Sequence, residues 1–160
     1  MTTKVTLRTA QAADAETLAS ISQRAFDSDI EIGAPGPGGP PGYDDPQWQQ
    51  QMMRTGDYHA LCVDRSVVGG AIVLETSPGG RELARIFIDP FWHGRGIGLQ
   101  AMALLMDHYP HTRRWTLDTP AWNPRTRDFY ERLGFVEYGR GMVGDGFELV
   151  LFEKRLDGEA

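Results

Sequence analysis

A glycine-rich run between a strand-like and a helix-like segment constrains this chain more than any other feature. The run Ile88–Gly98 has glycine at 94, 96 and 98. Glycines at alternate positions let the backbone approach an anion with no Cβ in the way, and they allow positive φ values that turn successive N–H groups toward one point. The helix expected from Ile97 would offer its unpaired N–H groups and positive dipole end to the same anion. The sequence therefore predicts a strand, a diphosphate-binding turn and a helix, in this order.

Two other kinds of glycine-rich loop do not match this run. A Walker-type loop ends in Gly-Lys-Ser/Thr, and a dinucleotide fingerprint has its third glycine one residue later, where this chain has Leu99. The dinucleotide fingerprint also belongs to an N-terminal βαβ unit, whereas this run lies past the middle of the chain. Neither a nucleotide hydrolase nor a dinucleotide-dependent enzyme is therefore indicated.

Length, cysteine content and charge narrow the class of protein. A chain of 160 residues fits one domain, 1–160, which can bury a core without disulfides. The one cysteine, Cys62, lies in an apolar run, so we expect it to pack as a small hydrophobe rather than act as a nucleophile. The net charge of −6 argues against nucleic acid as a partner, and no segment has the apolar length that spans a membrane. We expect a cytoplasmic protein with neither partner.

Apolar periodicity and turn residues divide the chain into strands and helices. The expected strands are 4–8, 59–64, 67–74, 82–88, 114–119, 135–139 and 147–153, and the expected helices are 12–26, 46–53, 98–109 and 124–133. Nine of the ten residues from Gly33 to Gly42 are Gly or Pro, which predicts a loop. The second and third strands should form a hairpin and the last two an antiparallel pair. This order of elements predicts an α/β fold with a mixed sheet.

Two motifs together resemble those of the GNAT family of N-acetyltransferases. The segment His93–Gly98, after Ile88-Asp89-Pro90, is similar to the family's acetyl-CoA loop Gln/Arg-x-x-Gly-x-Gly/Ala, with His93 in the place of Gln or Arg. The segment Asn123–Phe135 is similar to the later motif Asn-x-x-Ala-x-x-Phe-Tyr-x-x-x-Gly-Phe, with Thr126 in the place of Ala. The resemblance covers residues 82–135. It implies one GNAT domain with a central mixed, mostly antiparallel sheet in which two adjacent strands splay apart, flanked by helices.

The resemblance also implies which residues hold acetyl-CoA. The strand before the glycine run would pair through its backbone with the pantetheine arm, and the glycine run would hold the diphosphate. Because the chain is acidic overall, we expect Arg95 and either Arg125 or Arg127 to add charge there. His93 is expected to position the loop or contact the anion. The implied cofactor-binding residues are Ile86, Phe87, Ile88, His93, Gly94, Arg95, Gly96, Ile97, Gly98, Asn123 and Tyr130.

Transfer of an acyl group from a thioester to an amine needs a positioned donor, a deprotonated amine and a proton for the leaving thiolate. Tyr130 is the acid implied by the resemblance, and an ordinary tyrosine is protonated at neutral pH; alternatively, Phe129-Tyr130 packs its helix on the sheet. Glu82 is the implied base, because many relatives carry a glutamate there that acts through water. Asp118, or no protein base at all, is the alternative, and Glu82 could simply solvate a strand end.

The acceptor pocket in the family is built by the first helices and the loop that joins them, which here is 26–48. Phe26, Tyr43 and Trp48 are the expected substrate-binding residues. Acidic residues of the same segment, with the aromatic rings, could attract a cationic amine by charge and cation–π contact; they are Asp27, Asp29, Glu31, Asp44 and Asp45. A solvated surface loop is the open alternative.

The sequence predicts an N-acetyltransferase that moves an acetyl group from acetyl-CoA to a primary amine of a small molecule or peptide, by direct attack in a ternary complex. A sensor that binds CoA or an acyl-CoA without transfer is the alternative with the same fold, and an intact Tyr130 beside an intact glycine run favours catalysis. We expect no metal, because His108 and His111 flank Pro110 and cannot share a helix face. Homodimers are common in the family, so we expect one here.

Overall fold

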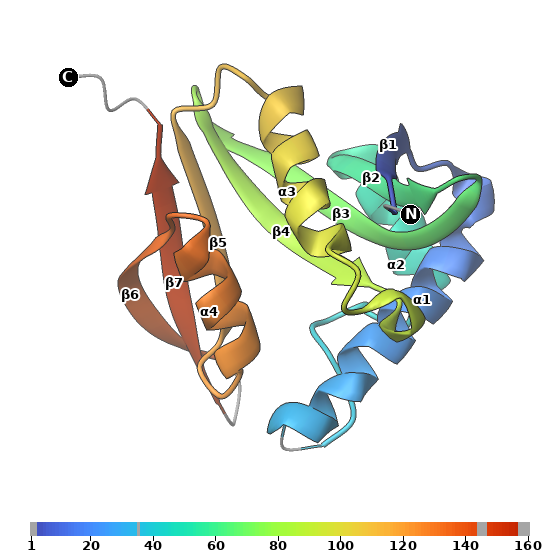
Figure 1. Ribbon diagram of the computed structural model, residues 1–160, viewed down its shortest axis with the longest axis horizontal. Helices are drawn as coiled ribbons and strands as arrows, with labels where there is room; N and C mark the ends of the chain where they lie inside the picture. Colours follow the sequence, from blue (N-terminus) through green and yellow to red (C-terminus); the bar gives the residue numbers. More distant parts are fainter. Residues whose placement is uncertain (1–2, 35, 144–146, 157–160) are drawn as a thin grey trace.

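The strands of this protein form one seven-stranded sheet (Figure 1). The structure is a computed structural model that describes residues 3–34, 36–143 and 147–156. The strands are β1 (Val5–Thr9), β2 (Asp57–Val63), β3 (Ser66–Ser77), β4 (Gly80–Ile88), β5 (Arg114–Pro120), β6 (Val136–Val143) and β7 (Phe147–Arg155), in the spatial order β1-β2-β3-β4-β5-β7-β6. Neighbours are antiparallel except β4 and β5, which are parallel. The predicted mixed, mostly antiparallel sheet is confirmed.

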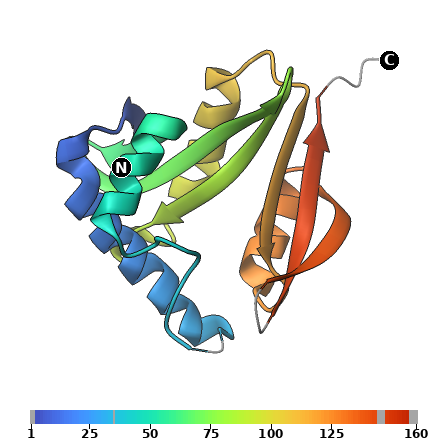
Figure 2. The ribbon, with the colours of Figure 1, turned by 180° about the vertical axis from the view of Figure 1, so that it is seen from behind.

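Helices cover both faces of the sheet. They are α1 (Ala15–Asp27), α2 (Pro46–Thr55), α3 (Ile97–His108) and α4 (Pro124–Arg132), with short 3-10 turns η1 (Ala12–Asp14), η2 (Ser28–Ile32) and η3 (Pro90–Trp92). Helices α3 and α4 lie on the face seen in Figure 1, and α1 and α2 lie on the opposite face, seen in Figure 2. We call the second of these faces, covered by α1 and α2, the acceptor face. The described residues between 33 and 45 form the predicted loop, and Pro35 lies outside the described residues.

Polar caps and glycines set the helix ends as the sequence indicates. Asp45 accepts a hydrogen bond from the N–H of Gln47 at 2.9 Å at the start of α2. Asn123 accepts from the N–H groups of Arg125 and Thr126 at 3.1 and 3.2 Å at the start of α4. Gly134, with φ of +92°, follows the end of α4. A side-chain oxygen at the N-cap satisfies N–H groups that have no partner inside the helix.

Strands β4 and β5 pair over a short distance and then part. Their register covers the pairs Gly80–Arg114, Arg81–Trp115 and Glu82–Thr116. Beyond these pairs β4 continues along β3 as far as Ile88, while β5 continues along β7, so the two ribbons diverge in Figure 1. We call the Glu82–Thr116 pair the fork. The splayed strands implied by the resemblance are confirmed.

One hydrophobic cluster spans both halves of the divided sheet. It contains Leu83, Met102 and Leu105 from the β4 and α3 side and Leu117, Tyr130, Phe135 and Phe152 from the β5, α4 and β7 side. A second cluster packs α1 and α2 on the acceptor face of β2, β3 and β4. Burial of apolar surface is the main force that holds such layers together. The cluster that both halves share therefore compensates for the short β4–β5 pairing.

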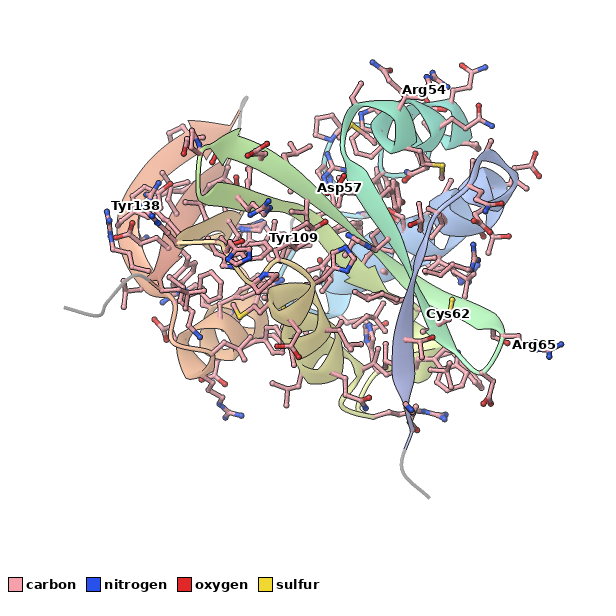
Figure 3. All side chains as sticks on the ribbon, turned by 90° about the horizontal axis from the view of Figure 1, so that it is seen from above. Arg54, Asp57, Cys62, Arg65, Tyr109 and Tyr138 are labelled. Atoms are coloured by element: carbon pink, nitrogen blue, oxygen red, sulfur yellow. The ribbon has the colours of Figure 1, made fainter. Side chains whose placement is uncertain are left out.

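A polar chain, buried at His59 and Tyr109, joins β2 to the end of α3. The hydroxyl of Tyr109 donates to Asp57 at 2.8 Å, and Nε2 of His59 lies 2.7 Å from the same hydroxyl (Figure 3 labels Asp57 and Tyr109). Burial lowers the pKa of His59, the nearby His108 lowers it further, and Asp57 opposes both. The sequence does not reveal this chain, because Tyr109 lies fifty or more residues from Asp57 and His59.

The structure can be compared with the expectations about Cys62, a metal site and a membrane-spanning segment. Cys62 is buried, as expected of a small packed hydrophobe (Figure 3). Within residues 3–34, 36–143 and 147–156, no three His, Cys, Asp or Glu residues are grouped as a metal site would require. Over the same residues, no helix combines the length and apolar character needed to cross a bilayer. That residues 1–160 form one domain stays a prediction.

Candidate functional site

The loop before α3, residues 93–98, has an open backbone. We call it the glycine loop. Gly94 and Gly96 both have φ of +77°, and a Cβ built on either one meets no atom within 4 Å. In the described part of the chain, no main-chain N–H from Gly94 to Leu99 donates a hydrogen bond. Buried amides are nearly always paired, so a row of unpaired amides at a helix N-terminus fits an anion bound from solvent. The loop thus has the shape and polarity of a diphosphate cradle.

The third glycine of the loop has a different role from the one expected. Gly98 lies inside α3 and is not among the glycines with positive φ. A Cβ on Gly98 would lie 3.3 Å from Cζ of Phe129 on α4. The expectation of a positive φ is wrong at this position, because Gly98 lies in the first turn of α3, where the backbone is helical. Its lack of a side chain instead leaves room for the ring of Phe129.

The side chains of His93 and Arg95 turn toward the protein's own groups. Nε2 of His93 lies 2.9 Å from the carbonyl oxygen of Ile88, so the ring closes on the end of β4. The guanidinium of Arg95 lies 4.7 Å from the ring centre of Trp92 and 5.5 Å from that of Phe91. His93 therefore positions the loop, and Arg95 is held by aromatic rings beside the open amides.

Only part of the β4 backbone faces the fork. The N–H of Asp89 donates to Val68 on β3 at 2.8 Å, and Gly70 is opposite Phe87 in the same register. Hydrogen-bonded pairs alternate along an antiparallel ladder, so the backbone groups of Phe87 point toward β3 and those of Ile86 and Ile88 point away from it. Phe87 is therefore not a backbone partner for pantetheine, which corrects the expectation. The backbone groups of Ile86 and the N–H of Ile88 remain as candidate partners for pantetheine.

Two carboxylates gather at the fork. Glu82 belongs to the last β4–β5 pair, and Asp118 lies on β5 two residues beyond Thr116. Burial raises the pKa of Glu82, and the charge of Asp118 raises it further. Loss of surrounding water also raises the pKa of Asp118, although Arg85 opposes the shift. One of the two residues that the sequence offered as alternative bases, Asp118, therefore raises the pKa of the other, Glu82.

Tyr130 packs through its ring, and its hydroxyl is not bonded within the described chain. The side chain is 5% exposed, and its ring centre lies 5.7 Å from that of Phe135 and 6.4 Å from that of Phe152. The hydroxyl makes no hydrogen bond to a described residue. Burial raises the pKa of Tyr130, and Asp118 raises it further. The packing role and the acid role are compatible, since the hydroxyl stays protonated near Asp118.

The expected substrate-binding aromatics meet on the acceptor face. The ring centre of Phe26 lies 6.2 Å from that of Tyr43 and 6.4 Å from that of Phe87. The guanidinium of Arg85 lies 4.4 Å from the ring centre of Trp48. The sequence analysis did not single out Arg85, although a charged residue inside the apolar strand segment 83–88 is the signal that would have found it.

Two of the acidic residues near these rings make structural hydrogen bonds. Asp45 caps α2, and Asp27 accepts a hydrogen bond from the hydroxyl of Tyr43 at 3.0 Å. Burial raises the pKa of Asp29, while Arg125 and His93 oppose the shift. The cation on Trp48 is the chain's own Arg85, and a Cβ on Gly42 would collide with the same ring. Glu31, Asp44 and Asp45 are exposed, and attraction of a cationic amine by this segment stays a prediction beside the alternative of a solvated surface loop.

Asn123 is confirmed as a cap, and Thr126 gains a contact that alanine could not make. The hydroxyl of Thr126 lies within hydrogen-bond distance of the hydroxyl of Thr119 on β5. This contact ties the start of α4 to the strand beyond the fork. Contact between Asn123 and a cofactor stays a prediction.

Comparison with known proteins agrees with this geometry. The model of the acetyltransferase (GNAT) family matches residues 21–135. The uncharacterized protein YrkN of Bacillus subtilis (strain 168) is 30% identical over 79 residues, which are 49% of this chain and 43% of that protein. The chain thus spans less than half of that relative's length.

Solved structures share the fold at low sequence identity. An acetyltransferase from Thermus thermophilus superposes with a TM-score of 0.75 at 20% identity, over 98% of each chain. The PaiA N-acetyltransferase of Thermoplasma acidophilum, solved in complex with coenzyme A, superposes with a TM-score of 0.73 at 16% identity, over 96% of this chain and 99% of that one. The family match, the divided sheet and the open amides of the glycine loop agree with one another. The chain therefore belongs to the acetyltransferase (GNAT) family.

Proposed function

We propose that this protein is an N-acetyltransferase that uses acetyl-CoA and transfers the acetyl group to a primary amine by direct attack in a ternary complex. The observation that carries the proposal is the unpaired row of main-chain N–H groups from Gly94 to Leu99. These donors suit a diphosphate, and CoA carries one next to its pantetheine arm. A relative of the same fold, PaiA of Thermoplasma acidophilum, was solved with coenzyme A.

The chain's own residues supply binding, proton transfer and orientation. Bound acetyl-CoA would supply an activated acyl group. The glycine loop would hold the diphosphate, and the backbone groups of Ile86 and Ile88 would orient the pantetheine arm along β4. Glu82 accepts the proton of the amine, directly or through water, because its raised pKa makes it a stronger base than an ordinary carboxylate. The Tyr130 hydroxyl donates to the leaving sulfur.

A binding and thiol-release assay tests the proposal. Acetyl-CoA should bind, and free thiol should appear when a suitable amine is added from a panel of polyamines, amino acids, aminoglycosides and peptide N-termini. Binding without thiol release across the whole panel would favour the acyl-CoA sensor. Failure to bind acetyl-CoA would overturn the proposal.

Tyr130→Phe should lower kcat about tenfold or more and leave the affinity for acetyl-CoA nearly unchanged. The substitution removes only the hydroxyl, and a hydrogen bond to a charged group contributes about 1.5–3 kcal/mol. The measurement is steady-state kinetics together with direct titration of acetyl-CoA. Tyr138→Phe on β6 is the control, because Tyr138 is 47% exposed (labelled in Figure 3). Equal kcat values for Tyr130→Phe and the unmodified protein would remove Tyr130 as the acid.

The proposal includes a cytoplasmic location and a homodimer. Light scattering after size-exclusion chromatography measures the mass in solution, for comparison with the 17.8 kDa of one chain. Fractionation of the producing cells addresses the location.

A further inference from the structure

Arg85 is held on the acceptor face by two contacts with the loop and helix that cover it. Its guanidinium stacks on Trp48 at 4.4 Å, and its Nη2 donates to the carbonyl oxygen of Pro41 at 2.9 Å. Trp48 belongs to α2 and Pro41 to the preceding loop. The side chain is therefore oriented before any acceptor arrives.

The charge of Arg85 has no direct partner in the described chain. No described carboxylate lies within 4.0 Å of its guanidinium. An arginine carries five N–H donors in a planar fork, and the contact to Pro41 uses one nitrogen. The Nε and Nη1 atoms make no hydrogen bond to a described residue, yet they are not among the buried unpaired atoms. These nitrogens therefore have donor capacity that no described residue uses.

The residues around Arg85 place it beside the fork. Arg85 and Asp118 affect each other's pKa through their charges, and Asp118 does the same to Glu82. Glu82 and Arg85 are three residues apart on one strand, a separation of about 10 Å at most, and the ladder to β3 slips by one residue between them. A negative pair and an unpartnered positive group thus lie within the span of one small molecule.

We propose that Arg85 binds the carboxylate of the acceptor, so that the amine substrate is an amino acid. This inference rests on the proposed function. The guanidinium fork matches a carboxylate in shape and charge, and Glu82 and Asp118 lie where the ammonium group of the same molecule would be. Stacking on Trp48 and the bond to Pro41 reduce the entropy lost on binding, because the side chain is already ordered.

Matched acceptors test the inference without any substitution. The protein is assayed for thiol release with the natural L-amino acids and with the carboxamide of each active one, at fixed acetyl-CoA. We expect kcat/KM to be about 10- to 100-fold higher for the acid than for its amide, as for loss of a charge-assisted hydrogen bond. Equal values for acid and amide would overturn the inference, and so would activity confined to polyamines.

Substitution of Arg85 then assigns the preference to this residue. Arg85→Gln should reduce the ratio of acid to amide toward one, and Arg85→Lys, which keeps the charge but loses the fork, should retain part of it. Arg65→Gln is the matched control, since Arg65 lies exposed in the β2–β3 turn (Figure 3). A structural role limited to holding the loop would lower both rates equally and leave the ratio unchanged, which would overturn the inference.

The two proposals fail in different ways. If no amine in the panel releases thiol, the proposed transfer fails, and the role of Arg85 fails with it. If amines release thiol without preference for a carboxylate, the proposed function stands and the role of Arg85 is refuted. If Arg85→Gln does not fold, as judged by circular dichroism, Arg85→Lys and the wild-type ratio still decide the question.

Discussion

Gly96→Val is expected to weaken acetyl-CoA binding about 100-fold or more, a loss of about 2.7 kcal/mol. Two effects act together. Valine is strained at a φ of +77°, since a left-handed backbone costs an L-residue about 1–2 kcal/mol. Its methyl groups would also occupy the open space above the loop, where a Cβ now meets nothing within 4 Å. Isothermal titration with acetyl-CoA measures the loss.

Gly38→Val is a control that also places valine at a positive φ. Gly38 also has a positive φ, +142°, and open space around an added Cβ, but it belongs to the Gly/Pro loop and not to the glycine loop. Its substitution should leave acetyl-CoA affinity within about threefold of wild type. An unchanged affinity in Gly96→Val, with the fold intact by circular dichroism, would contradict the diphosphate cradle.

Glu82→Gln should lower kcat by about 10²- to 10⁴-fold, the usual contribution of a general base. The amide has nearly the same shape as the carboxylate but cannot take the proton of the amine. Acetyl-CoA affinity should change little, because the glycine loop lies at the other end of β4. Glu75→Gln on β3 is the control, since Glu75 is exposed. If kcat survives in Glu82→Gln, Asp118 or solvent is the base.

The pH profile separates Glu82 from Asp118. A base acts only when deprotonated, so kcat/KM falls as the pH drops through the pKa of Glu82. Burial and then Asp118 raise this pKa above that of an ordinary glutamate, so the acid limb of the profile should lie at a higher pH than an ordinary carboxylate would give. Asp118→Asn removes one cause of the shift and should move the limb to lower pH. A limb that stays in place would exclude coupling between the two groups.

Local chemistry explains why the sequence predicts most of the fold. Asp45, Asn123 and Gly134 act within their own turns, so their effect on helix ends can be foreseen from neighbouring residues. The glycine loop is equally local, and its position between β4 and α3 agrees with the expectation. The hairpin turn shifts by one residue, because Asp64 adopts a φ of +56° and joins Arg65 in the turn.

Long-range placement explains what the sequence misses. Whether Phe87 pairs with β3 or faces the fork depends on the register of a ladder, which a strand pattern does not fix. Arg85 meets Trp48 and Pro41 across about forty residues of chain. The polar chain of His59, Tyr109 and Asp57 depends on a similar convergence. The roles of these residues follow from tertiary contacts rather than from local pattern.

The short β4–β5 pairing at the fork has a consequence for the stability of the whole sheet. The main-chain pairing of β4 with β5 in the described structure runs only from Gly80–Arg114 to Glu82–Thr116. The hydrophobic cluster that both halves of the sheet share also holds them together. A molecule lying along the unzipped edge of β4 would act as a missing strand. The acyl donor would then stabilise the folded protein as well as react. The concentration of the donor would therefore determine how strongly the two halves of the sheet are held together.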